Sequence, residues 1–313
     1  MDIDKVRVVN DPTVKWIADH WHDNHGNKSN DLTFGFLSIP FDYAVSHRPG
    51  TRIGPQTIID TLNSYSLYCA DKRVSLENTV FRNLGAVDIV HDLQQSYANM
   101  VEAVSTIPKD ILPIFLGGDH SITDPIIRGM KKRIEGKSMG IIMFDTHFDF
   151  RDPLPGKEHS GHWLKTLENE IDYNSLAIIG ISAPIYSPAY MHELEKRGAL
   201  IKTVYDLRRQ GRESVVKEAV DHVLNNADGI YFTVDIDGID QAFAPGCSVP
   251  NPSGLYPFEV MDSIFEISKM APVFGMDINE VSPWFDHPQN FTTHVAAHIL
   301  LNFMAGNVKR LSE

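Results

Sequence analysis

The feature that most constrains the fold of this chain is a recurring alternation of short apolar runs with longer amphipathic stretches. The apolar, β-rich runs occupy residues 34–39, 111–115, 140–144, 176–181, 230–234 and 273–278. Helical patterns lie between several of them, at residues 92–107, 121–133, 213–226 and 257–269. Continuously apolar strands that alternate with helices are typical of a parallel sheet covered on both faces. We therefore predict an α/β fold with a doubly wound, mostly parallel sheet rather than a closed barrel.

Acidic residues and histidines follow four of these runs. The sequences after the runs are LGGDHS (116–121), DTHFD (145–149), DIDGID (235–240) and NEVSP (279–283). In open α/β sheets, ligand sites form beyond the carboxyl ends of the strands. We therefore expect these four stretches to converge at one edge of the sheet.

Six side chains in these stretches have the chemistry of metal ligands. They are His120, Asp145, His147, Asp149, Asp235 and Asp237. Four carboxylates packed together cannot all ionise without a cation, because like charges a few ångströms apart raise the pKa values of some of them. Two divalent ions would balance four carboxylates, and the mixed carboxylate and imidazole donors favour Mn²⁺ first, then Ni²⁺, Zn²⁺ or Fe²⁺. A single DxHxD stretch also occurs in helix caps and surface ion pairs, so the prediction depends on all three motifs together.

Composition excludes several other classes of protein. The 41 acidic and 28 basic residues give a net charge of −13, which disfavours nucleic acids and anionic membranes as partners. No window approaches the roughly 18 apolar residues of a membrane span, and the start lacks a signal-peptide pattern, so we predict a cytoplasmic protein. Cys69 and Cys247 are far apart, which leaves nitrogen and oxygen atoms as metal ligands. Without repeats or linkers, we predict one domain over residues 1–313, with an N-terminal extension over about residues 1–30.

Several motifs in this order resemble those of the ureohydrolases, the family of arginases, agmatinases, guanidino-acid hydrolases and formimidoylglutamases. The matching segments cover most of the chain: RPGTRIGP (48–55), GGDHS (117–121), DTHFD (145–149), DIDGID with AFAPG (235–246), GCSVPNPSGLY (246–256) and NEVSP (279–283). The resemblance implies a three-layer, arginase-like fold with a binuclear centre, usually of manganese, with nickel as an alternative. It also implies a homo-oligomer, a trimer or a hexamer.

The resemblance further implies which residues hold each ion. One ion would be bound by His120, Asp145, Asp149 and Asp235, and the other by Asp145, His147, Asp235 and Asp237. Asp145 and Asp235 would bridge the two ions. Members of this family hydrolyse a C–N bond of a guanidino or formimino group and release urea or formamide together with an amine.

Two further residues fit that chemistry. A guanidinium is a poor electrophile, so its hydrolysis needs an activated water. Glu280, which follows the last apolar run, is placed to accept charge-assisted hydrogen bonds from the N–H groups of the substrate. Asp149 has a second oxygen that can take a proton and pass it to the leaving amine.

The segment after DTHFD departs from the pattern of the family. Ser160 stands where arginases and agmatinases carry a histidine that shuttles protons, so we name His162 as the candidate shuttle, with His159 as the alternative. Formimidoylglutamases also lack that histidine. Arg151 echoes a formimidoylglutamase pattern, whereas RPGTRIGP is more typical of agmatinases. Trp163 replaces a smaller residue, which predicts a reshaped substrate pocket, an aromatic face for a cation, or core packing.

The leading hypothesis is therefore a binuclear ureohydrolase that resembles agmatinases and other guanidino-compound hydrolases and releases urea. A formimidoylglutamase-like enzyme that releases formamide is the first alternative. A non-catalytic partner subunit that keeps the fold is the second. A mononuclear zinc deacetylase of the same fold is disfavoured, because such proteins lack the complete set of two-metal ligands.

Overall fold

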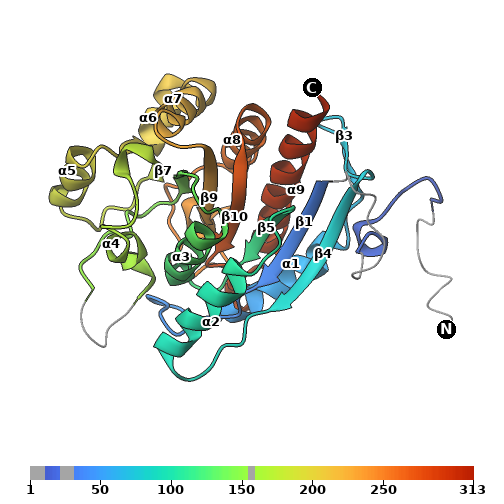
Figure 1. The fold of residues 1–313 in the computed structure, drawn as a ribbon, viewed down its shortest axis with the longest axis horizontal. Helices are drawn as coiled ribbons and strands as arrows, with labels where there is room; N and C mark the ends of the chain where they lie inside the picture. The colour runs from blue at the N-terminus through green and yellow to red at the C-terminus, as the bar shows by residue number, and fades with distance from the viewer. Residues whose placement is uncertain (1–10, 22–31, 154–158) are drawn as a thin grey trace.

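The computed structural model describes residues 11–21, 32–153 and 159–313. Its centre is an eight-stranded sheet with the strand order β4-β1-β5-β10-β9-β6-β7-β8, in which all paired neighbours are parallel (Figure 1). The strands are β1 Leu32–Ser38, β4 Thr79–Ala86, β5 Ile111–Leu116, β6 Met139–Phe144, β7 Leu176–Ile181, β8 Leu200–Thr203, β9 Gly229–Asp235 and β10 Val273–Asn279, beside a small hairpin of β2 Tyr68–Cys69 and β3 Val74–Ser75. The predicted parallel, doubly wound α/β sheet is confirmed.

Helices cover both faces of this sheet. They are α1 Gly54–Leu62, α2 Leu93–Ser105, α3 Thr123–Arg133, α4 Trp163–Thr166, α5 Pro188–Lys196, α6 Val204–Gln210, α7 Arg212–Leu224, α8 Pro257–Met270 and α9 Phe291–Ser312. One buried cluster packs side chains of α1, α7, α8 and α9 on the sheet, and a second packs those of α2, α3 and α5 on the opposite face. The three layers can be followed in Figure 1.

The alternation of side chains along each strand divides the core into these two clusters. In β6, Ile142 and Phe144 belong to the first cluster, and Ile141 and Met143 belong to the second. Because both faces of a central strand are buried, the sequence of such a strand is apolar throughout. This explains why the central strands could be recognised as continuous apolar runs.

The six predicted strands and four predicted helices are all present, with ends that lie within two residues of those expected. Strands β4 and β8 were missed, since they lie at the two edges of the sheet and include polar or partly exposed residues. Residues 1–10 and 22–30 of the predicted N-terminal extension lie outside the described residues.

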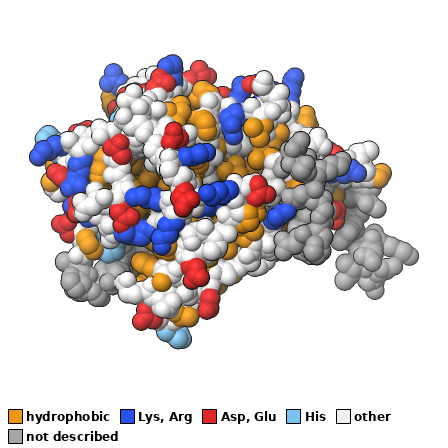
Figure 2. All heavy atoms as spheres, in the orientation of Figure 1, with side chains coloured by type: hydrophobic (Ala, Val, Ile, Leu, Met, Phe, Trp, Pro, Cys, Tyr) orange, Lys and Arg blue, Asp and Glu red, His pale blue; other side chains and the backbone are white. Residues whose placement is uncertain are grey.

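The described surface and helices concern two predictions from the sequence, that nucleic acids and anionic membranes are disfavoured as partners and that the chain has no membrane span. On the face shown in Figure 2, Lys and Arg side chains are interspersed with Asp and Glu side chains. Within the described ranges, no helix combines the length and the apolar character needed to cross a membrane.

Candidate metal centre

The predicted site residues lie at the carboxyl ends of four neighbouring strands. Strands β5, β10, β9 and β6 are adjacent in the sheet, and their carboxyl ends or the residues just after them carry the predicted ligands His120, Asp235 and Asp145 and, after β10, the predicted substrate-binding residue Glu280. All four side chains are buried. The expected convergence at one edge of the sheet is therefore observed.

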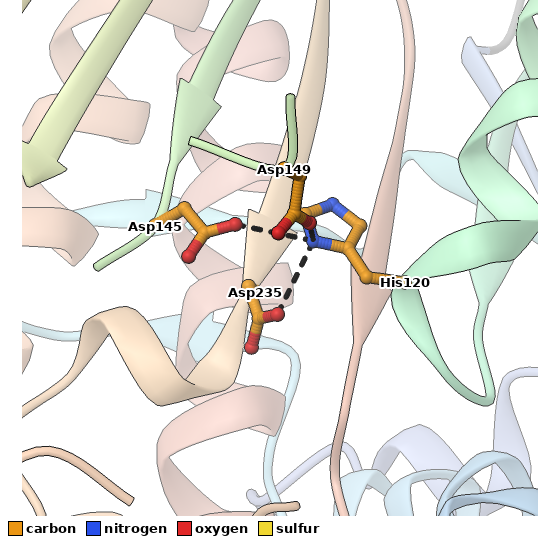
Figure 3. Close-up of side chains that lie close together, drawn as sticks. All are labelled: His120, Asp145, Asp149 and Asp235. Atoms are coloured by element: carbon orange, nitrogen blue, oxygen red, sulfur yellow. Dashed lines mark ion pairs between the residues drawn. The ribbon is translucent and has the colours of Figure 1, made fainter. Parts of the chain in front are cut away.

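His120 lies at the centre of the first group of ligands (Figure 3). Its Nδ1 atom is 3.2 Å from Asp145 Oδ2, 3.0 Å from Asp149 Oδ2 and 3.2 Å from Asp235 Oδ2. One ligand atom from each of the four residues falls within 4.8 Å of the others. An imidazole nitrogen and three carboxylate oxygens so arranged can surround a single cation.

Asp145, His147 and Asp237 form a second group of the same kind. His147 Nδ1 is 3.5 Å from Asp145 Oδ1 and 3.2 Å from Asp237 Oδ2. Asp145 is thus common to both groups, as expected of a bridging ligand. Asp235 belongs only to the first group, and its Oδ1 atom accepts the backbone N–H of Asp237 at 2.8 Å. Bridging by Asp235 stays a prediction.

Local backbone geometry explains the spacing of these motifs. Asp145 Oδ1 accepts the N–H of His147 at 2.6 Å, in the same i to i+2 pattern as Asp235 with Asp237. Such turns fold the chain back so that both side chains face one point. Asp149 and Glu280 have left-handed backbone conformations, with φ angles of 47° and 64°. Strain of this type is found most often at functional sites.

The close approach of the GGDHS segment requires glycine. A Cβ atom added to Gly118 would lie 1.6 Å from the carbonyl oxygen of Phe41. The Gly118 carbonyl in turn accepts the N–H of Glu280 at 2.8 Å. Glycine at position 118 therefore lets the segment that carries His120 pack against the chain that follows β1, while its carbonyl links that segment to Glu280 beyond β10.

The cluster has unsatisfied polar atoms that fit a cation. Buried atoms without a hydrogen-bond partner include His120 Nδ1, Asp145 Oδ2, Asp237 Oδ1 and Glu280 Oε2. Burying polar atoms without partners is costly, so their concentration at one place calls for an explanation. The first three are nitrogen and oxygen donors of the types that divalent transition metals bind. The residues present therefore fit a pair of divalent ions.

The charges of the cluster perturb the pKa values of its carboxyl groups. Burial, followed by the repulsion of Asp145, raises the pKa of Asp235 to about 6. Burial and the charge of Asp235 raise the pKa of Asp237 well above its usual value, and they do the same to Glu280. Burial opposes a charge on His120, but the nearby carboxylates of Asp145, Asp149 and Asp235 outweigh it and raise the pKa of this imidazole. Without metal, protons compensate the negative charge.

This competition with protons predicts that stabilisation by metal increases with pH. Because the pKa of Asp235 is raised from 3.8 to about 6 by folding, the contribution of this group to the stability of the metal-free protein is lost as the pH rises through that window. A divalent ion replaces the proton, and its affinity rises as the ligands deprotonate. The difference in Tm with and without Mn²⁺ should therefore be larger at pH 7.5 than at pH 5. Equal differences at both pH values would contradict this prediction.

A buried hydrogen-bond network contacts the Nε2 atom of His120, on the side of the ring opposite the carboxylates. The Nε2 atom of His120 is 2.8 Å from Thr233 Oγ1, and this hydroxyl donates to Asp277 Oδ1 at 2.6 Å. Asp277 also accepts hydrogen bonds from Tyr231 and Asn279. The network is satisfied if the imidazole proton is on Nε2, which leaves Nδ1 as a ligand. Sequence analysis missed this network, although an isolated carboxylate inside the apolar run 273–278 was a usable signal.

Replacing Asp277 with asparagine tests the role of this network. Asp277→Asn keeps the shape of the side chain but weakens the acceptor of the Thr233 hydroxyl. Substitutions behind a metal-binding histidine lower metal affinity by about 10- to 100-fold. We therefore expect calorimetric titration with Mn²⁺ to show that loss for one ion and a smaller change for the other. Equal weakening of both ions, or of neither, would contradict the assignment.

A narrow cavity of about 50 Å³ opens beside the cluster. Its lining includes His147, Asp149, Asp235, Asp237, Glu280, Ser46, Arg151, Ser160 and Tyr186. Arg151 lies over the ring of Tyr186, with its guanidinium carbon 5.0 Å from the ring centroid. A cation therefore stands on the wall of a cavity that is otherwise rich in carboxylates.

Glu280 and Ser160 lie where a substrate could contact them. Glu280 Oε1 accepts the backbone N–H of His120 at 3.0 Å, which leaves Oε2 as the oxygen without a hydrogen-bond partner. The Ser160 hydroxyl is 2.8 Å from that of Ser46, on the wall of the same cavity. Both side chains are thus fixed by neighbouring segments of the chain.

The structure does not bring His162 into this cavity. His162 is 3% exposed, its Nε2 accepts the backbone N–H of His159 at 2.9 Å, and the two rings stack at 4.6 Å. The short 3₁₀ helix Ser160–His162 turns the side chain toward a separate cavity on the α2 and α3 side. We therefore do not retain His162 as the proton shuttle.

Comparisons with known proteins agree with this fold and site. The Arginase family model matches residues 32–306. A formimidoylglutamase from Halalkalibacterium halodurans is 32% identical over 279 residues, which cover 87% of this chain and 86% of that protein. A guanidinobutyrase from Pseudomonas aeruginosa is 30% identical over 284 residues, which cover 87% and 86%. The crystal structure of formimidoylglutamase from Bacillus subtilis matches with a TM-score of 0.88 and 28% identity, covering 96% of this chain and 94% of that chain.

The chain belongs to the arginase family. It is accordingly a hydrolase that acts on C–N bonds of linear amidines. The predicted resemblance and the arginase-like fold are both confirmed.

Proposed function

We propose that this chain hydrolyses a C–N bond in a small amidine that also carries a carboxylate, with two divalent ions bound at the cluster. The observation that carries this proposal is the presence of Arg151 and the cluster carboxylates on the wall of one cavity. The names of the two relatives denote enzymes for formimidoylglutamate and guanidinobutyrate, which are both acids. Such substrates combine an amidine for the carboxylates with an anion for the arginine.

The two ions would be held by the groups centred on His120 and His147. Mn²⁺ is the first choice and Ni²⁺ the second, because the donors are carboxylates and imidazoles. When bound, such ions supply the acidity that makes water a nucleophile near neutral pH.

Side chains of this protein would perform the remaining tasks. Glu280 Oε2 would accept a hydrogen bond from an amidine N–H and so orient the reacting carbon. Asp149, which also lines the cavity, would take a proton from the attacking water and give it to the leaving amine. This assigns proton transfer to a carboxylate rather than to His162.

Arg151 argues against agmatine as the preferred substrate. Agmatine carries an ammonium group at its far end, which the guanidinium of Arg151 would repel. Within residues 11–21, 32–153 and 159–313, no carboxylate forms an ion pair with Arg151, and its contact is the Tyr186 ring. A substrate carboxylate would supply that charge-assisted partner.

The agmatinase-like segment 48–55 has structural contacts that explain its sequence. Arg48 donates to the backbone carbonyls of Cys247 and Ser248, and Arg52 pairs with Asp42 at 3.0 Å. This segment therefore holds neighbouring loops in place.

Ser160 lies in the wall of the cavity and favours the formimino branch of the family, because members of that branch also lack the histidine that shuttles protons. We therefore name a formimino acid as the first candidate substrate.

A matched set of substrates tests this proposal. Mn²⁺-loaded protein should release formamide from formiminoglutamate, or urea from 4-guanidinobutyrate, with a kcat/KM at least about 100-fold above that for agmatine. Arg151→Ala should raise KM for the acid by about 10- to 100-fold without weakening the reaction with agmatine, whereas Arg151→Lys should keep part of the preference. A preference for agmatine in the unmodified protein would contradict the proposal.

The assembly and location of the chain stay predictions. They comprise a single domain over 1–313, a homo-oligomer with three or six subunits, and a cytoplasmic protein without nucleic-acid or membrane partners.

A further inference from the structure

The indole of Trp163 contacts a predicted metal ligand directly. Trp163 is 1% exposed, and its Nε1–H group donates to Asp149 Oδ2 at 3.0 Å. The side chain does not line the cavity beside the cluster but a second cavity, of about 450 Å³, on the α2 and α3 side. The structure therefore supports neither a pocket wall nor an aromatic face for a cationic substrate, and it adds a polar contact to core packing.

Asp149 depends on outside support for its conformation. Its backbone is left-handed, which is unfavourable for a residue with a side chain. The segment that contains Trp163 supplies two backbone hydrogen bonds to this turn: Leu164 N–H donates to the Asp149 carbonyl at 3.1 Å, and Arg151 N–H donates to the Gly161 carbonyl at 3.2 Å. The indole N–H is a third link between the two segments, and it is the one that reaches the carboxylate.

The hydrogen bond of Trp163 distinguishes the two oxygens of Asp149. Oδ2 accepts the indole N–H and is also the oxygen 3.0 Å from His120 Nδ1. Oδ1 lies on the side of Gly161, which lines the cavity beside the cluster. The Trp163 ring packs on the His120 ring as well, with centroids 5.3 Å apart. The indole thus contacts two of the four residues of the first group, Asp149 and His120.

We infer that Trp163 is a positioning residue, whose indole N–H directs one oxygen of Asp149 toward the ion beside His120 and leaves the other facing the substrate. This inference rests on the proposed function, because it concerns the same cluster. It gives a physical role to a residue that departs from the family pattern. The indole acts through Asp149 and touches neither the substrate nor an ion.

Trp163→Phe removes the N–H group and keeps an aromatic ring. In calorimetric titration with Mn²⁺, we expect the affinity for the ion beside His120 to fall by about 10- to 100-fold. We also expect kcat to be lower and KM for the substrate to stay unchanged. The matched control is Trp21→Phe, which also removes an indole hydrogen bond, that to Asn63 at 2.7 Å, at the β4 side of the sheet. The control should leave metal affinity and kcat unchanged.

A double-mutant cycle with Asp149→Ala separates positioning from packing. If Trp163 acts through Asp149, adding Trp163→Phe to Asp149→Ala should cause no further loss of metal affinity. Equal losses in both backgrounds would show a packing role and overturn the inference. The inference would also be overturned if the unmodified chain binds two ions and the Trp163→Phe protein binds them with the same affinity. Failure of the unmodified chain to bind any divalent ion would instead overturn the proposed function.

A spectroscopic measurement keeps the test valid if Trp163→Phe does not fold. The chain has four tryptophans, so ¹⁵N-tryptophan labelling gives four indole N–H resonances. Phenylalanine variants of Trp16, Trp21 and Trp284 assign the fourth resonance to Trp163 by elimination. That resonance should move in the Asp149→Ala protein, because it loses a carboxylate acceptor. An unmoved resonance would overturn the inference.

Discussion

Asp145→Ala is expected to abolish binding of both divalent ions and to lower kcat/KM by more than about 1000-fold. Asp145 is the residue that belongs to both groups of ligands, so its loss opens both sites at once. Its Oδ1 atom also fixes His147 through the backbone N–H at 2.6 Å. Calorimetric titration with Mn²⁺ and an assay of formamide or urea release measure the two effects.

Asp60→Ala provides the control for this substitution. Asp60 is an exposed carboxylate on α1 that accepts a hydrogen bond from Gln56, and its loss should change neither metal content nor activity. If the Asp145→Ala protein retains two ions, the assignment of Asp145 as a ligand of both ions is refuted. Activity retained without bound metal would indicate that the cluster has no catalytic role.

Glu280→Gln is expected to lower kcat/KM by about 100- to 1000-fold while the chain still binds two ions. Glu280 lies outside both groups of metal ligands but lines the cavity, and its Oε2 has no hydrogen-bond partner. Glutamine has nearly the same shape but cannot neutralise a cationic amidine. Metal content and steady-state kinetics on the same preparation separate the two properties.

The same substitution has an expected effect on stability. Burial and the charges of Asp235 and Asp119 raise the pKa of Glu280, so a neutral amide removes an unfavourable charge from the folded state. Metal-free Glu280→Gln protein should therefore have a Tm no lower than that of the unmodified protein. Glu102→Gln, an exposed position on α2, serves as the control. Loss of the metal together with the activity would show that Glu280 acts as a ligand.

The sequence was informative where burial and chemistry coincide in short segments. Strands β6 and β9 are buried on both faces, so they read as apolar runs, and the ligand motifs follow them directly. The turn geometry of Asp145 and Asp235 is likewise local, since each bonds the residue two positions later. These features need no knowledge of distant contacts.

Features that depend on strand register or on packing could not be predicted. Asp277 lies beside Thr233 because β10 and β9 pair in one particular register. Trp163 meets Asp149 across a gap of 14 positions that no motif describes. His162 was chosen because it is close to Ser160 in sequence, yet one 3₁₀ turn directs it elsewhere. Sequence proximity to a motif therefore did not establish membership of the site.

We propose that six side chains from three stretches of the chain hold a pair of divalent ions. Native mass spectrometry of protein reconstituted with Mn²⁺, with metal content determined on the same sample, measures how many ions the chain binds. We expect two ions per chain in the unmodified protein. One ion per chain, or none after reconstitution, would contradict it.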